Sequence, residues 1–175
     1  MARARLQDVL SATYLDDLEH RPIEEIRALR AECQQLEVDQ SYLRRLIQGR
    51  LDIVRSEQAR RVGGAGPSDV SDIVEHLPEI LADRVHAPGV GRLPTYLSPS
   101  EDAGLTSELD AVFRSLGPID RLADHQVDDL ATALAELELA VSARRRSLHE
   151  RIDALQSELT RRYKTGEATV DSLLQ

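Results

Sequence analysis

The chain has 175 residues, enough for one domain, but a single Phe and no Trp leave few large side chains for a globular core. Its net charge of −9 argues against a protein dedicated to binding nucleic acid, and its one cysteine excludes an internal disulfide or a cysteine-based metal cluster. It shows neither a signal peptide nor an apolar run long enough to span a membrane, so we expect a soluble cytoplasmic protein.

The first half of the chain is predicted to hold a short helix and a long one. Residues 1–21 are expected to form a short N-terminal helix that contacts a partner. Pro22 suits the first position of a long helix over 22–62, which Gly63 and Gly64 end.

The second half is predicted to hold a connector and another long helix. Within the connector, 63–122, Ser68 caps a helix over about 69–85 that Pro78 breaks or kinks. The Pro- and Gly-rich stretch 87–104 is typical of a loop or of disorder. Three further segments follow: a short helix from Thr106 or Ser107 to about Leu116, a long helix over 123–165, and a tail over 166–175.

Both long helices carry a heptad pattern typical of a coiled coil. Arg50, Arg144 and Arg151 occupy d positions, so we expect a weak seam there that closes fully only with a ligand or partner. The a positions hold Ile26, Cys33, Gln40, Ile47 and Val54 in the first helix and Val127, Leu134, Val141, Leu148 and Leu155 in the second; Leu29, Leu36, Leu43, Leu130 and Leu137 hold d positions.

A ladder of polar residues occurs once on each long helix with the same spacing. Steps of four, three, four and four residues keep the five side chains on one helix face, within an arc of roughly 80°. Ladder and heptads repeat at the same offset, so this is an internal repeat in register. The ladders are Glu37, Ser41, Arg44, Gln48 and Asp52, and Glu138, Ser142, Arg145, His149 and Asp153.

The heptad frame predicts how the two helices pair. In this frame the five residues of each ladder occupy positions e, b, e, b and f. In an antiparallel pair, e positions of one helix flank e positions of the other, whereas a parallel pair sets e against g and separates the ladders. We therefore predict an all-α fold, a long antiparallel two-helix coiled-coil hairpin with short accessory helices and a flexible connector. Both ladders then line one groove, with Arg44 and Arg145 near its middle.

The ladder residues have the chemistry to bind a guanine nucleotide. Carboxylates match the N1–H and N2–H₂ donors of guanine, and Arg matches O6 and N7 with two parallel hydrogen bonds. Net positive stretches over 44–62 and 143–164 coincide with the later parts of the ladders and suit an anion. For most of the individual arginines, including Arg45 and Arg146, a solvated or phosphate-steering role is the simpler interpretation.

The spacing Glu-x3-Ser-x2-Arg-x3-Gln-x3-Asp resembles the cyclic di-GMP signature of the RsiG family of actinobacterial anti-sigma factors. The resemblance implies that all ten ladder residues bind cyclic di-GMP, as a dimer, between antiparallel helices. It also implies that the loaded protein sequesters a WhiG-type sigma factor, similar to flagellar sigma factors, that drives sporulation genes. Only His149 departs from the pattern, which has Gln there, and a neutral imidazole can partly replace an amide.

Two other functions fit the same sequence. One is a constitutive coiled-coil adaptor whose ladders are solvated, and the other is an anti-sigma factor that has lost nucleotide control through His149. Catalysis is not expected, because the sequence has no Gly-rich phosphate loop, nucleophile motif or metal-ligand spacing. We expect no direct contact with nucleic acid or membrane. The acidic residues 16–25 and 69–79 could bind basic surfaces of a sigma factor.

Overall fold

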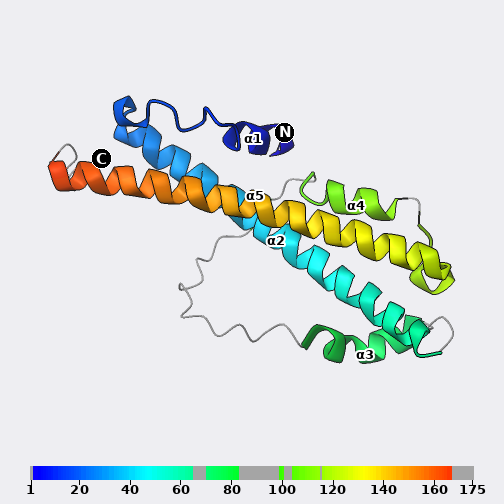
Figure 1. The fold of residues 1–175 in the computed structure, drawn as a ribbon. Helices are drawn as coiled ribbons and strands as arrows, with labels where there is room; N and C mark the ends of the chain where they lie inside the picture. Colours follow the sequence, from blue (N-terminus) through cyan, green and yellow to red (C-terminus); the bar gives the residue numbers. More distant parts are fainter. Residues whose placement is uncertain (1, 65–69, 83–98, 101–103, 115, 167–175) are drawn as a thin grey trace. The chain divides into compact units, whose positions relative to one another are not determined.

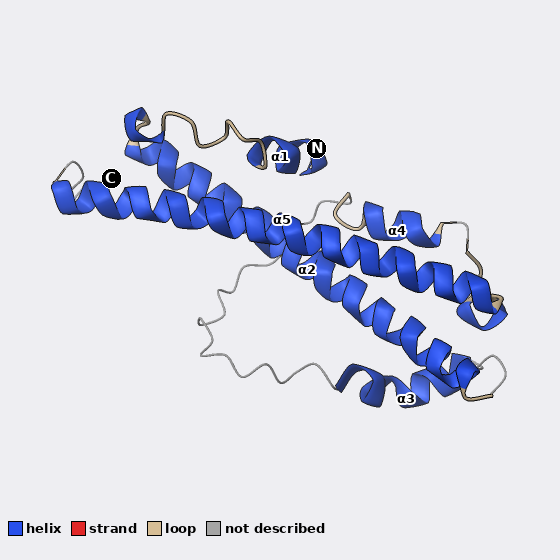
Figure 2. Cartoon of the chain, viewed as in Figure 1, coloured by secondary structure: helices blue, strands red, loops and turns tan. Residues whose placement is uncertain are grey.

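The computed structural model describes residues 2–64, 70–82, 99–100, 104–114 and 116–166 (Figures 1 and 2). Within these ranges every regular element is a helix, which confirms the predicted fold class. None of these helices is both long and apolar enough to cross a membrane. The elements are α1 (Ala2–Val9), the 3-10 helix η1 (Leu18–His20), α2 (Ile23–Val62), α3 (Val70–Ala82), α4 (Ser107–Phe113), the 3-10 helix η2 (Ile119–Arg121) and α5 (Asp124–Thr165).

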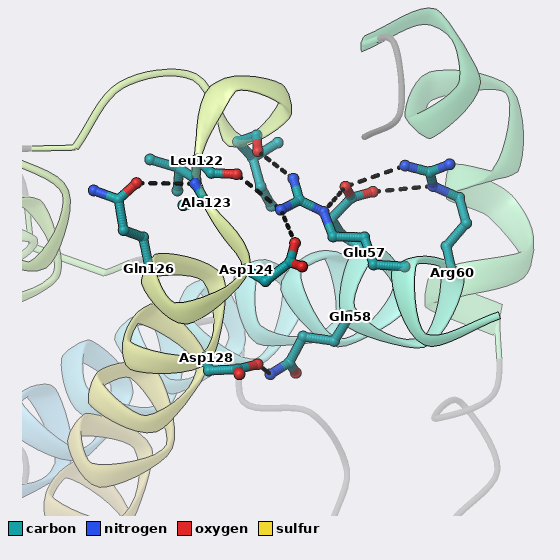
Figure 3. Close-up of polar contacts among 10 residues, drawn as sticks. Glu57, Gln58, Arg60, Leu122, Ala123, Asp124, Gln126 and Asp128 are labelled. Carbon is teal, nitrogen blue, oxygen red and sulfur yellow. Dashed lines mark hydrogen bonds and ion pairs between the residues drawn. The ribbon is translucent and has the colours of Figure 1, made fainter. Parts of the chain in front are cut away.

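The long helices α2 and α5 begin and end at the predicted signals. The Pro22 carbonyl accepts the first helical hydrogen bond of α2, from Ile26. Gly64 ends α2 in the left-handed region with φ +85°, a conformation that glycine adopts without strain. At the start of α5, Gln126 folds back to accept a hydrogen bond from the Ala123 N–H (Figure 3), and Gly166 ends α5 with φ +76°.

The chain divides into two compact units, and each long helix contributes one half to each of them. Unit 1 comprises residues 1–41, 97–104 and 142–175. Unit 2 comprises residues 42–96 and 105–141.

Unit 1 packs the first half of α2 against the second half of α5. Arg27 lies over the Tyr163 ring, whereas Glu37 contacts Arg145, so residue numbers rise along α2 as they fall along α5 and the helices are antiparallel. α1 packs against them with Val9 only 1% exposed. The buried apolar cluster contains Leu6, Val9, Ile26, Cys33, Leu36, Leu148, Leu155 and Leu159.

Unit 2 packs the second half of α2 against the first half of α5. Here Arg44 contacts Glu138 and Gln58 contacts Asp128, so the helices are again antiparallel. α4 packs against them through Leu109, which is fully buried. The buried apolar cluster contains Leu43, Ile47, Leu51, Val54, Leu109, Leu122, Val127, Leu130, Ala131, Leu134 and Val141.

The predicted heptad frame describes this burial well. All ten a-position side chains are buried, and at most 5% of any of them is exposed. The one polar member, Gln40, has a buried Oε1 without a hydrogen-bond partner among the described residues. A polar residue at one a position commonly fixes the register of a coiled coil at a cost in stability.

The accessory elements differ from the prediction in three places. The N-terminal helix ends at Val9 rather than near residue 20, because the carbonyls of Val9 and Leu10 accept hydrogen bonds from Arg151 and not from a following helical turn. Of the predicted break or kink at Pro78, the break is wrong: α3 continues through Pro78, whose exposed position leaves the unbonded carbonyl one turn earlier open to water. The predicted short helix ends at Phe113, three residues early. The stretch 87–104 and the tail fall mostly outside the described residues.

At one end of unit 2, Glu57 binds Arg60 and Arg61 in a cluster that we call the arginine clasp (Figure 3). Glu57, whose side chain is 1% exposed, accepts hydrogen bonds from Arg60 and from Arg61, with Arg61 Nε 2.5 Å from its Oε1. Arg61 also donates to the Ile119 and Leu122 carbonyls, 3.1 and 2.8 Å away, at the two ends of η2. The clasp therefore ties the last turn of α2 to the turn that begins α5.

The same clasp occurs in unit 1 at the repeat-related positions. Arg161 and Arg162 bind Glu158, with Arg162 Nε 2.7 Å from Glu158 Oε1. Arg162 donates to carbonyls at both ends of η1, those of Leu18 and Arg21. Each long helix thus ends on the turn that begins the other. The hydrogen bond from Arg161 lowers the pKa of Glu158 to about 2. Burial alone would raise this pKa, and the hydrogen bond from Arg162 also lowers it.

Replacing Glu158 with Gln should destabilise the protein in a pH-dependent way. The lowered pKa means that the ionised carboxylate stabilises the folded state above the unfolded value of 4.5, and that this contribution disappears as the pH falls toward 2. We expect Glu158→Gln to lower the free energy of unfolding by about 1–3 kcal/mol at neutral pH. Urea unfolding at neutral pH and at acid pH measures this difference.

The exposed Glu150 on the same helix provides a matched control. Glu150→Gln should change the free energy of unfolding little at any pH. Equal effects of the two substitutions, or a Glu158→Gln effect that does not shrink in acid, would contradict the clasp.

Candidate functional site

The two ladders place their residues in both units. Unit 1 holds Glu37 and Ser41 from α2 with four ladder residues of α5, and unit 2 holds the remaining three of α2 with one of α5. In each unit the helices bring ladder residues of different repeats into contact. The unit 1 set is Glu37, Ser41, Ser142, Arg145, His149 and Asp153; the unit 2 set is Arg44, Gln48, Asp52 and Glu138.

In unit 1 the ladder residues converge on one carboxylate oxygen of Glu37. Arg145 approaches from α5 with Nη2 at 2.9 Å and Nε at 3.1 Å from Glu37 Oε1. Ser41 donates to the same oxygen at 2.7 Å, and His149 Nε2 lies 3.4 Å from it. Glu37 is mostly covered, with 17% of its side chain exposed.

The pKa of Glu37 reflects this environment. Burial alone would raise it, because a carboxylate loses solvation. The hydrogen bonds from Ser41 and Arg145, with the nearby positive charge, outweigh burial and lower the pKa of Glu37 below its ordinary value. Glu37 is therefore an anionic acceptor at neutral pH.

In unit 2 the equivalent carboxylate is Glu138. Arg44 Nε lies 2.7 Å from Glu138 Oε1, and Gln48 Nε2 donates to the same oxygen at 3.1 Å. Glu138 is covered to a similar extent as Glu37, with 18% of its side chain exposed. As predicted from the heptad frame, a Glu at an e position of one helix meets an Arg at an e position of the other.

The cross-helix contacts of the two sets correspond under the internal repeat. Glu37 with Arg145 matches Glu138 with Arg44. His149, the one departure from the repeat, stands where Gln48 stands, and its Nε2 approaches Glu37 as the Gln48 amide approaches Glu138. A neutral imidazole protonated at Nε2 therefore supplies the same donor as the amide.

The other three ladder residues differ in exposure. Asp52 and Ser142 are half-buried, and Asp153 is exposed. Arg45 and Arg146, which follow the ladder arginines in sequence, are also exposed. The contacts described above join the other seven ladder residues within the two units.

A cavity of about 510 Å³ in unit 2 is separate from the ladder. None of the ten ladder residues lines it; its walls come from α2, α4, η2 and α5, and include Arg50, Phe113 and Leu130. Within the described ranges, no three His, Cys, Asp or Glu side chains are grouped so that they could hold a metal ion.

Sequence reasoning missed what the d-position arginines do. Arg151 was expected to weaken the seam, yet it donates to three carbonyls at the end of α1. Arg50, at the repeat-related position, lies over the Phe113 ring at 4.9 Å from its centroid. The repeat offset of the ladder also relates Glu57 to Glu158 and Arg61 to Arg162, so following it further along both helices would have revealed these residues.

Comparison with known proteins identifies the family. A model of the RsiG-like family matches residues 12–81 and 114–175, most of the chain. The chain belongs to the RsiG-like family. No curated protein matches the sequence significantly. RsiG-like proteins are regulatory anti-sigma factors rather than enzymes, so family membership indicates an anti-sigma role here.

The cross-helix pairs of this RsiG-like protein should be energetically coupled. For Arg145 with Glu37, and for Arg44 with Glu138, double-mutant cycles to Ala should give favourable coupling energies of about 1 kcal/mol, because both pairs are largely covered. Urea unfolding of the single and double variants measures the coupling.

The more exposed pair Arg21 and Glu25 is the control, with an expected coupling of about 0.3–0.5 kcal/mol. A coupling near zero for both ladder pairs would show that they do not hold the helices together in solution.

Proposed function

We propose that this protein is an anti-sigma factor controlled by cyclic di-GMP, which binds to the ladder residues as a dimer. When loaded, it sequesters a sigma factor of the WhiG or flagellar type in the cytoplasm and blocks transcription initiation at sporulation genes. Family membership supports the anti-sigma role. The ladder chemistry supports the nucleotide.

The observation that carries the proposal is the repeated pairing of Glu37 with Arg145 and of Glu138 with Arg44. Each pair sets a carboxylate beside a guanidinium at a helix–helix contact. A carboxylate can accept from guanine N1–H and N2–H₂, and a guanidinium can bind O6 and N7 or a phosphate. The guanidinium plane can also stack on a base. Two equivalent sets suit a ligand that is itself twofold.

Without ligand, these groups bind one another. Glu37 Oε1 contacts Ser41, Arg145 and His149. Glu138 Oε1 accepts hydrogen bonds from Arg44 and Gln48. Nucleotide binding therefore exchanges intramolecular hydrogen bonds for ligand hydrogen bonds, so the net gain per contact is smaller than the contact itself. We expect the exchange to be most favourable with several guanines and phosphates bound together.

Nucleotide and sigma factor should affect each other's binding equally. If cyclic di-GMP tightens sigma binding by a given factor, the sigma factor must tighten cyclic di-GMP binding by the same factor. An anti-sigma factor without nucleotide control is the second candidate, because the cross-helix pairs could also serve only to hold the helices together. Titration with cyclic di-GMP, with and without the sigma factor, separates the two functions. If the nucleotide shows no saturable binding in either condition, the result favours an anti-sigma factor without nucleotide control.

Replacing both Arg44 and Arg145 with Ala should abolish nucleotide binding. Each substitution removes a charge-assisted contact of about 1.5–3 kcal/mol, so affinity for cyclic di-GMP should fall by at least about 100-fold. Isothermal titration calorimetry measures the loss. Circular dichroism should show nearly unchanged helix content.

The neighbouring arginines supply a control with the same change in charge. Arg45 and Arg146 are exposed and follow the ladder arginines in both repeats. The double variant Arg45→Ala with Arg146→Ala should keep affinity within severalfold. If both double variants bind alike, the ladder arginines do not contact the nucleotide; if the first loses its helicity, they are structural.

The side chain at position 149 should contribute a hydrogen-bond donor to nucleotide binding. His149→Gln restores the repeat and should bind cyclic di-GMP at least as tightly as the wild type, because its amide supplies the N–H donor that Gln48 supplies in unit 2. His149→Ala removes this donor and should weaken binding severalfold. Calorimetric titrations of the three proteins measure the difference. Equal affinities for all three would exclude a contact from His149.

A further inference from the structure

Helix α3 has no counterpart in the internal repeat. The repeat covers a short helix, a 3-10 turn and a long helix: α1, η1 and α2 in the first copy, and α4, η2 and α5 in the second. α3 lies in the stretch between the copies (green in Figure 1). The repeat that pairs the two long helices therefore does not account for the presence of α3.

The described side chains of α3 do not join the core of unit 2. None of them belongs to its buried cluster or to the apolar residues packed against that cluster. Val74 is 58% exposed, one of four large apolar side chains that stand out as exposed in the described residues. Pro78, one helical turn further along the same face, is exposed, and Leu77 beside it is half-buried.

The family match nevertheless includes this helix. The matched segment 12–81 runs from the N-terminal turn through almost all of α3, whereas 82–113, which contains α4, is not matched. The family shares this helix, yet none of its described side chains belongs to the core cluster, so an external contact explains these side chains better than a role in stability. α3 also carries Asp72, Glu75 and Glu79 and has no Lys or Arg.

We propose that α3 is a docking helix for the sigma factor, and this assignment rests on the function proposed above. Its apolar face, Val74, Leu77 and Pro78, would lie in an apolar groove of the partner, and Glu75 and Glu79 would face Lys or Arg at the rim of that groove. This is the helix-in-groove mode of recognition. A sigma factor has suitable surfaces, because it binds promoter DNA with basic residues and core polymerase with apolar ones. Contact with α3 would cover a surface that transcription requires.

The test compares two exposed valines of unit 2. Val74→Lys places a cation on the apolar face of α3, and Val62→Lys places the same cation on Val62, 89% exposed at the end of α2. Fluorescence anisotropy with labelled sigma factor and saturating cyclic di-GMP measures affinity. Val74→Lys should weaken sigma binding at least tenfold, whereas Val62→Lys should stay within twofold of the wild type. Both variants should bind cyclic di-GMP alone like the wild type.

A second measurement does not depend on the folding of Val74→Lys. Sigma binding by the wild type should weaken with added salt, and Glu75→Gln with Glu79→Gln should reduce that salt dependence. Asp129→Asn with Glu136→Gln, two exposed acids of α5 outside the ladders and outside the acidic segments 16–25 and 69–79, is the control and should leave it unchanged.

Each outcome decides between the two proposals. If the wild type binds the sigma factor and the two Lys variants bind it equally, α3 is not the docking helix and the proposed function stands. If the wild type binds no sigma factor with nucleotide present, both proposals are wrong. If Val74→Lys only dissociates a dimer of this chain without affecting sigma binding, α3 is a self-association helix and the docking assignment is overturned.

Discussion

Burial of the a-position side chains fixes the rotation of α2 and α5 about their own axes, and the position of every ladder residue follows from that rotation. In unit 1 the row includes Ile26 and Leu148, and in unit 2 it includes Ile47 and Leu134, all of them fully buried. Turning either helix would expose several of these side chains at about 1.5–3 kcal/mol each. Once this row is buried, the e positions of one helix necessarily face those of the other, and Glu meets Arg in both units. The chemistry of the ladder is therefore set by the apolar packing of the a positions.

The sequence predicted the parts of the fold that local or periodic signals determine. Pro22, Gly64 and Gly166 mark the ends of the long helices within a residue or two, and the seven-residue period identified the buried row. The heptad frame predicted that e positions of the two helices flank each other, and the structure shows that Glu37 meets Arg145 there. His149 was correctly identified as the point where the repeat departs from its pattern, but only the structure shows that its Nε2 reaches the same oxygen position as the Gln48 amide.

Contacts distant in sequence decided the rest. The end of α1 at Val9 depends on Arg151, more than 140 residues away, whose guanidinium binds the carbonyls that a longer helix would have used. No local pattern around Val9 contains that information. The clasp arginines Arg61 and Arg162 were similarly read as part of a positive stretch, because their carbonyl acceptors in η1 and η2 become neighbours only when the hairpin forms. Pro78 is the reverse case. Its local sequence signal predicts a helix break, but the helix continues because the residues around Pro78 are exposed to water.

The repeat gives the chain unequal tolerance to changes in length. Between the two copies, residues can be gained at little cost, because doubling the length of a loop adds only about 0.6 kcal/mol to its closure entropy. Inside α2 or α5 the opposite holds. One residue inserted between Glu37 and Arg44 would rotate the ladder residues after the insertion by about 100° about the helix axis relative to those before it. The buried a-position residues after the insertion would rotate with them. The stretch between the copies can thus change in length outside α3, whereas the two long helices can change residues but not the number of residues between ladder positions.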